Sequence, residues 1–169
     1  MAITLHWHSS VSGAAISRNT TLLGQGYCLT TVGDVIVDCQ WLLTEDIGLQ
    51  AGADVTEKIR AALLHSDGMT VEFDLLRQGT DYSRAVWKAL TEIPLGQVST
   101  YSEVAKKLNS GARAVARACR NNPYPGIIPC HRVVAKAGIG GFMGQSQGSL
   151  VELKRRLLVY ERKIALSGK

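Results

Sequence analysis

The pattern of the sequence changes near residue 80, and this change most limits the folds that the chain can adopt. Before it, short apolar runs between turn residues predict a hairpin over 30–39 and a strand over 71–75, and helical spacing predicts a helix over 54–64. After it, apolar residues recur at helical spacing. We therefore expect an α/β fold, with a small sheet and a helix in 1–78 and a mainly helical domain with a helix-turn-helix in 79–169.

The helical region begins with an apolar face that predicts one helix ending before Pro94 and Gly96. The residues expected to be buried on that face are Tyr82, Ala85, Val86, Ala89, Leu90 and Ile93. Thr100 and Glu103 then form a predicted capping box, which opens a short helix to Leu108. After the turn 109–111, a second short helix over 112–120 completes a pattern typical of a helix-turn-helix, although any helical hairpin looks similar.

A last helix is predicted from a second capping box, Ser149 with Glu152. Its spacing predicts an apolar face of Leu150, Leu153, Leu157 and Leu158, with Lys154, Arg155 and Arg156 directed outward.

Charge is divided unevenly along the chain. Residues 1–100 hold 6 Lys/Arg and 11 Asp/Glu, a net of −5, whereas residues 101–169 hold 13 Lys/Arg and 3 Asp/Glu, a net of +10. Arg113, Arg117 and Arg120 share one face of the 112–120 helix, and Val115, Ala118 and Cys119 lie on the opposite face, which can pack. This concentration of positive charge favours a nucleic-acid partner, and a solvated basic surface without a partner is the alternative.

Other features limit the compartment and the cofactors. No apolar run is long enough for a membrane span, and the first residues show no secretory signal, so we expect a cytoplasmic protein without a membrane partner. There the four cysteines stay reduced. Cys28, Cys39 and three N-terminal histidines lack metal-ligand spacing, so we expect no metal and no cofactor.

Cys130 is the candidate nucleophile, because a thiolate is strongly nucleophilic and a histidine follows it directly. His131 can act as the base, directly or through a water; on a strand the two side chains would point to opposite faces, which favours the water. A buried structural cysteine beside a chance histidine is the alternative.

The segment from Ile128 to Val133, Ile-Pro-Cys-His-Arg-Val, resembles the active-site signature of the O6-alkylguanine-DNA alkyltransferases, also called methylated-DNA–protein-cysteine methyltransferases. Further segments resemble the same family over about residues 73–161: 79–87, 93–96, 100–105, 112–115, 120–123 and 157–161. The resemblance implies repair of O6-alkylguanine in double-stranded DNA by a single, irreversible transfer of the alkyl group to the protein, after the damaged nucleotide is flipped out.

The same resemblance assigns roles to individual residues. Cys130 accepts the alkyl group, His131 acts through water as its base, and Glu161 orients His131. Tyr101 donates a proton or hydrogen bond to the departing guanine, and Arg113 fills the stack that the nucleotide leaves. The remaining assignments are Asn122 for the turn between helix and active site, Val134, Gly141, Phe142, Met143 and Gly144 for the guanine pocket, and Ala112, Ala114, Arg117 and Arg120 for the DNA-facing helix.

Two departures and two rival functions accompany this hypothesis. Relatives often carry Tyr-Ser-Gly where this chain has Phe142-Met143-Gly144, and the loop to Leu150 is a few residues longer than in some relatives, so the range of alkyl groups is open. A non-catalytic damage sensor is a rival, but such proteins replace the acceptor cysteine. A helix-turn-helix transcription regulator is another, but it normally needs a dimer or an effector domain, and we expect a monomer.

Overall fold

The chain falls into two compact units, which are described separately. The computed structural model describes residues 3–43, 53–54, 57–64 and 70–168. The first unit holds Met1–Gln78 and Pro123–Ile127, and the second holds Gly79–Asn122 and Ile128–Lys169. Mixed α/β structure, expected from the sequence, is confirmed. That 1–78 and 79–169 are separate domains stays a prediction, and the units place 123–127 with the first.

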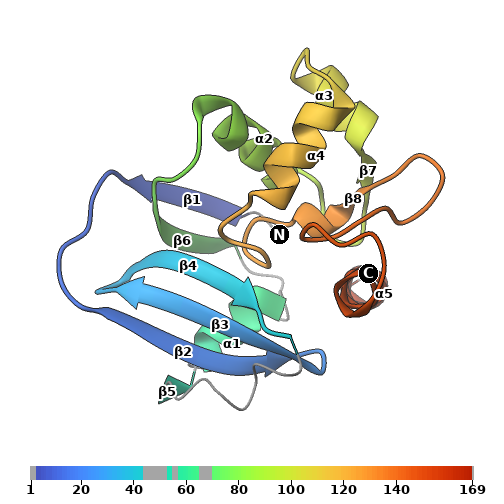
Figure 1. The fold of residues 1–169 in the computed structure, drawn as a ribbon. Coiled ribbons are helices and arrows are strands. Elements are labelled where there is room, and N and C mark those ends of the chain that lie inside the picture. Colours follow the sequence, from blue (N-terminus) through green and yellow to red (C-terminus); the bar gives the residue numbers. More distant parts are fainter. Residues whose placement is uncertain (1–2, 44–52, 55–56, 65–69, 169) are drawn as a thin grey trace. The chain divides into compact units, whose positions relative to one another are not determined.

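A six-stranded sheet in the order β1-β6-β4-β3-β2-β5 forms most of the first unit (Figure 1). β2, β3 and β4 pair antiparallel, and β6 pairs parallel with β1 and β4. The elements of this unit are β1 Ile3–His8, β2 Ala15–Leu22, β3 Gln25–Val32, β4 Val35–Trp41, β5 Ala53–Asp54, α1 Glu57–Leu64 and β6 Val71–Leu76.

The local signals of the first unit are mostly confirmed. The hairpin predicted over 30–39 is β3 and β4, with Gly33 at φ +57 in the turn between them. This conformation suits glycine because it lacks a Cβ. The predicted strand 71–75 is β6. The predicted helix is shorter than expected: Asp54 lies in β5, α1 begins at Glu57, and residues 55–56 lie outside the described part.

The segment Pro123–Ile127 is held by the sheet of the first unit. The Cys39 amide donates to the Pro123 carbonyl at 3.0 Å, and the buried Tyr27 hydroxyl donates to the Pro125 carbonyl at 2.6 Å. The Tyr124 side chain is fully buried, and its hydroxyl donates to the Leu76 carbonyl at 2.5 Å. Five residues that follow the 112–120 helix are therefore fixed by hydrogen bonds to β3, β4 and β6.

The second unit is mainly helical. Its elements are α2 Asp81–Thr91, β7 Ser99–Thr100, α3 Tyr101–Lys107, α4 Ala112–Arg120, the 3-10 turn η1 Cys130–Arg132, β8 Val133–Val134 and α5 Ser149–Ser167. The expected face of α2 is partly wrong, because Tyr82 and Ala85 are exposed while Trp87 is buried. The Trp87 indole N–H donates to the Ala118 carbonyl at 2.9 Å, so α2 packs against α4 through this ring.

The two short helices form as predicted. The side chains and amides of Thr100 and Glu103 complete a capping box at the start of α3. Asn109, at φ +50, lies in the turn, and Gly111 precedes α4. On α4, Val115, Ala118 and Cys119 are buried, as the sequence predicted.

Two predictions about α5 are wrong. The second capping box does not form, because Gly148 occupies the N-cap without a side-chain hydrogen bond. Lys154, expected to point outward, is fully buried. Neither α5, the longest helix described, nor any other helix in the described ranges is long and apolar enough to cross a membrane.

Replacing Tyr27 with Phe should reduce the free energy of unfolding by about 1–3 kcal/mol, because the variant leaves the Pro125 carbonyl without this donor. Urea denaturation of wild type and variant measures the difference. Tyr160→Phe, at a partly exposed position on α5, is the control and should change stability by less than about 0.5 kcal/mol. Equal effects of the two substitutions would show that the Tyr27 hydroxyl does not anchor the segment.

Candidate active site

Cys130 begins a single 3-10 turn, η1. It does not lie on a strand, which is the geometry that the sequence argument for a water between Cys130 and His131 requires. Its amide donates to the Ile128 carbonyl at 2.8 Å, and the Arg132 amide donates to the Pro129 carbonyl at 3.0 Å. The three side chains of the turn, Cys130, His131 and Arg132, are all buried. The expectation that neighbours would point to opposite faces therefore does not apply.

His131 and Arg132 share one buried carboxylate, that of Glu161 on α5. The distance from His131 Nε2 to Glu161 Oε1 is 2.6 Å, and Arg132 donates from Nε to Oε2 at 2.8 Å and from Nη2 to Oε1 at 3.0 Å. Arg132 Nη1 donates to the Ile93 carbonyl at 2.7 Å. Burial alone would raise the pKa of Glu161, but the charges and hydrogen bonds of His131 and Arg132 outweigh it and hold the pKa well below its ordinary value.

This network determines which nitrogen of the neutral His131 ring carries the hydrogen. An ionised carboxylate can only accept hydrogen bonds, so His131 Nε2 must carry the hydrogen that points at Glu161. In the neutral ring, Nδ1 is then the nitrogen with a free lone pair. Nδ1 is buried and has no hydrogen-bond partner in the described part of the chain. Nδ1 is therefore the hydrogen-bond acceptor of the neutral ring.

The Cys130 thiol is subject to opposing influences. Burial raises its pKa, whereas a hydrogen bond with the Asn122 side chain and the positive charge of Lys154 lower it. Asn122 is buried just after α4, and its Nδ2 donates to the Ile128 carbonyl at 2.9 Å. Asn122 thus fixes the backbone before the nucleophile and also contacts the thiol.

Lys154 is a residue of the site that the sequence analysis missed. Its ammonium donates to the Val133 carbonyl at 2.6 Å and to the Gly141 carbonyl at 2.9 Å, and it lies 5.9 Å from the centre of the Tyr101 ring. Burial lowers the pKa of Lys154 to about 8, although Cys130 and Cys119 act in the opposite direction. No carboxylate pairs with it among the described residues.

The position of Lys154 was available from helical spacing. Lys154 follows Leu150 by four residues and precedes Leu157 by three, so it lies on the apolar stripe of α5. A lysine is seldom buried without a partner, and here two backbone carbonyls are the partners of its ammonium.

A cavity of about 290 Å³ opens at the thiol. Cys130, Cys119 and Tyr101 line it together with Arg120 and the loop Gly140–Ser146. Burial raises the pKa of the Tyr101 hydroxyl to about 12, so this hydroxyl keeps its proton at neutral pH. The predicted wall residues Gly141, Phe142, Met143 and Gly144 are present; Val134 does not line this cavity, and its neighbour Ala135 does.

Met143 contacts the nucleophile directly. The two bonds between the backbones of Phe142 and Gln145, at 2.8 and 2.9 Å, close a tight turn with Met143 at φ +47 and Gly144 at φ +84. Positive φ is uncommon for a side chain such as methionine. In this conformation Met143 Sδ lies 4.0 Å from Cys130 Sγ.

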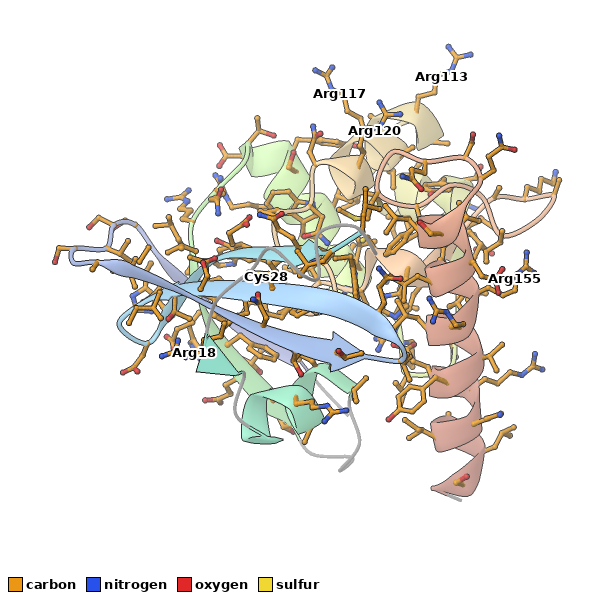
Figure 2. The ribbon with its side chains drawn as sticks, turned by 60° about the horizontal axis from the view of Figure 1, so that its bottom comes forward. Arg18, Cys28, Arg113, Arg117, Arg120 and Arg155 are labelled. Carbon is orange, nitrogen blue, oxygen red and sulfur yellow. The ribbon has the colours of Figure 1, made fainter. Side chains whose placement is uncertain are left out.

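The arginines of α4 form an exposed basic face. Arg113, Arg117 and Arg120 extend outward from this helix (Figure 2) and line one hollow with Ala116 and Asn121. Arg120 also reaches the thiol cavity. Ala114 is exposed and Ala112 half-buried, so the first turn of α4 carries small side chains beside Arg113.

No group of three or more His, Cys, Asp or Glu side chains in the described ranges could hold a metal ion. Of the described residues, those that line the cavity also include no histidine and no carboxylate.

Residues 81–163 match the family model described as 6-O-methylguanine DNA methyltransferase, DNA binding domain. The methylated-DNA–protein-cysteine methyltransferase of Archaeoglobus fulgidus is 45% identical over 85 residues, which cover 50% of this chain and 58% of the relative. That of Methanothermobacter thermautotrophicus is 43% identical over 107 residues, covering 60% of this chain and 57% of the relative. The chain thus matches under two thirds of the length of these relatives.

Solved structures extend the likeness beyond the matched domain. The O6-methylguanine methyltransferase of Mycobacterium tuberculosis has a TM-score of 0.67 at 28% identity, covering 89% of this chain and 94% of that one. The M. tuberculosis OGT in complex with DNA has a TM-score of 0.65 at 28% identity, covering 88% of this chain and 93% of that one.

Glu161→Gln should destabilise the protein by about 3–5 kcal/mol, because it leaves the buried Arg132 guanidinium without its charge partner. Glu152→Gln, which removes an exposed pairing with Arg155 on the same helix, should cost less than about 1 kcal/mol. Urea denaturation compares the two. Since the folded-state pKa of Glu161 is lowered, its contribution is complete above the ordinary pKa of about 4.3 and is lost as the pH falls below it. Equal losses in both variants would contradict the shared-carboxylate network.

Lys154→Met should raise the pKa of the Cys130 thiol further, since it removes a positive charge that favours the thiolate. The rate of alkylation of Cys130 by iodoacetamide at pH 7 should fall on the order of tenfold, as for a 1.4 kcal/mol loss of thiolate stabilisation. The rate-against-pH profile should move to higher pH. Lys163→Met, at an exposed position of α5, is the control. If the pH profile of alkylation does not shift in Lys154→Met, Lys154 only holds the loop at Gly141 and does not act on the thiol.

Proposed function

We propose that this chain repairs DNA by moving the alkyl group of an O6-alkylguanine onto Cys130, because residues 81–163 match the model of the 6-O-methylguanine DNA methyltransferase DNA-binding domain. The observation that carries the proposal is a buried thiol at a cavity of about 290 Å³, next in the chain to a histidine whose tautomer is fixed by a carboxylate. The sulfur attacks the alkyl carbon, the bond from that carbon to O6 breaks, and the electron pair stays with the guanine. The thioether that remains has no ready leaving group, so each molecule reacts once.

Proton movements follow from the hydrogen bonds of the site. Cys130 must lose its proton to react as a thiolate, and His131 Nδ1 is the nearby acceptor, directly or through a water. Glu161 stabilises the imidazolium that results, so it is a positioning residue. The departing guanine gains a proton or a hydrogen bond, and Tyr101 is the donor in the cavity that keeps its hydrogen at neutral pH.

The helix pair α3 and α4 serves as a helix-turn-helix that binds duplex DNA. Arg117 and Arg120 are placed to neutralise phosphates, contacts that are independent of sequence. Arg113, near the start of α4, would enter the space left by the flipped nucleotide. The small side chains of Ala112 and Ala114 allow the helix to approach the minor groove closely. The cytoplasm expected from the sequence suits this chemistry, because the acceptor must be a reduced thiol.

The two rival functions fit these observations less well. A damage sensor has no use for a thiol with an adjacent proton acceptor. A transcription regulator with the same helix pair would not need a cavity at a cysteine.

We expect Cys130 to gain one methyl group when the protein is mixed with a duplex that carries a single O6-methylguanine. Intact mass spectrometry should show one added CH₂ per molecule, and peptide mapping should place it on Cys130. Cys130→Ala should abolish the transfer, and Cys28→Ala, on β3 of the first unit, should keep it. Methylation at another cysteine, or turnover of more than one duplex per molecule, would refute the proposed reaction.

Arg113→Ala should slow transfer from duplex DNA at least about tenfold, because the extruded nucleotide loses the side chain that fills its place. Transfer from the free base O6-benzylguanine should stay nearly unchanged, since a free base needs no extrusion. Arg155→Ala, an exposed arginine of α5 (Figure 2), is the matched control and should affect neither reaction. Equal losses on duplex and free base would show that Arg113 supports the thiol site instead.

A further inference from the structure

Three sulfur-containing residues line the same cavity. Cys119 on α4, Cys130 on η1 and Met143 on the loop turn all line it, and the Cys130 and Met143 sulfurs are 4.0 Å apart. The proposed alkyl transfer needs one of these sulfurs. Thiolate and thioether sulfurs together are the ligands that select monovalent copper, whereas harder ions prefer imidazole, carboxylate or carbonyl ligands. Among the described residues, the cavity lining contains neither imidazole nor carboxylate.

We propose that Cys119, Cys130 and Met143 form a three-sulfur site for a soft monovalent metal ion, Cu(I). The proposal adds a thioether to the residue types considered above for metal binding, and it departs from the absence of metal expected from the sequence.

The separation between the Cys130 and Met143 sulfurs in the structure fits such an ion. A metal–sulfur bond of about 2.3 Å, the length known for zinc thiolates, gives sulfur atoms about 4.0 Å apart when three ligands surround the metal in a plane. This is the separation of Cys130 Sγ and Met143 Sδ. Met143 holds its position through the turn closed by Phe142 and Gln145, so the thioether faces the thiol before any ion arrives.

Positive charge beside the cavity offsets the charge of the bound ion and its thiolates. On binding, both thiols release their protons to solvent and the metal keeps its oxidation state, so the ion with its two thiolates carries a charge of −1. The Lys154 ammonium, held by the Val133 and Gly141 carbonyls, supplies one positive charge to the same site. Arg120, which also lines the cavity, is exposed to solvent. The softness of the sulfur ligands, and not the charge, is what favours a monovalent ion.

Bound copper would occupy the lone pair with which Cys130 attacks an alkyl carbon. The ion would therefore block the proposed alkyl transfer reversibly. Metal binding itself does not depend on that function.

The test is anaerobic competition for Cu(I) between the full chain and the coloured complex of Cu(I) with bicinchoninate. Wild type and the control Cys28→Ala should each remove one equivalent from the dye. Cys119→Ala and Met143→Leu should each lower the affinity at least about tenfold, that is, by 1.4 kcal/mol or more. Met143→Leu nearly conserves volume on a partly exposed turn, so it tests the thioether even if Cys119→Ala destabilises α4. Unchanged affinity in Met143→Leu, or full uptake by Cys130→Ala, would overturn the three-sulfur site.

A second measurement separates the site from the alkyl transfer. Wild type loaded with Cu(I) should not accept a methyl group from the methylated duplex until excess bicinchoninate removes the metal. Methyl transfer at the full rate with copper bound would overturn the blocking role. Copper uptake is read from the dye alone, so its result stands whether or not metal-free protein accepts a methyl group.

Discussion

The second unit is organised around one buried carboxylate. Glu161 lies on α5, yet its two oxygens reach both side chains that follow the nucleophile, His131 and Arg132. Burying three ionisable groups is costly unless each is paired, and here each partner compensates another. Arg132 also bonds to the Ile93 carbonyl just after α2. Arg132 thus joins the turn η1 to the last helix and to the residues just after α2, and Glu161 determines which nitrogen of His131 carries the hydrogen.

A second electrostatic element acts on the other side of the thiol. Lys154 has carbonyl groups as its hydrogen-bond partners, so its charge remains available to an anion that forms nearby. Cys130, Cys119 and the ring of Tyr101 lie within its influence. Glu161 acts through the histidine and Lys154 acts on the sulfur. In the proposed reaction, the two charges would therefore assist different parts of one proton transfer, and they do not pair with each other.

Short-range signals in the sequence were sufficient for much of this fold. The hairpin of β3 and β4, the capping box of Thr100 and Glu103, and the buried face of α4 depend on neighbours within a few residues. The failures depend on distant partners. Trp87 takes the core position because the Ala118 carbonyl accepts its N–H, and Lys154 is buried because Val133 and Gly141 offer carbonyls. No local pattern reports such partners, and Cys119 and Lys154 entered the site only through the structure.

The path of the chain has a consequence for any attempt to divide this protein. The matched range 81–163 looks like a detachable module, yet Pro123–Ile127 inside it belongs to the first unit. A fragment that begins after Gln78 would contain Tyr124 but not β6. The tyrosine, fully buried in the whole chain, would lose the Leu76 carbonyl that accepts its hydrogen bond. Only Pro123 separates it from Asn122, which contacts the Cys130 thiol. The two units are thus interlaced along the sequence, and a working protein should be recovered more readily by recombining two separately made fragments than from the C-terminal fragment alone.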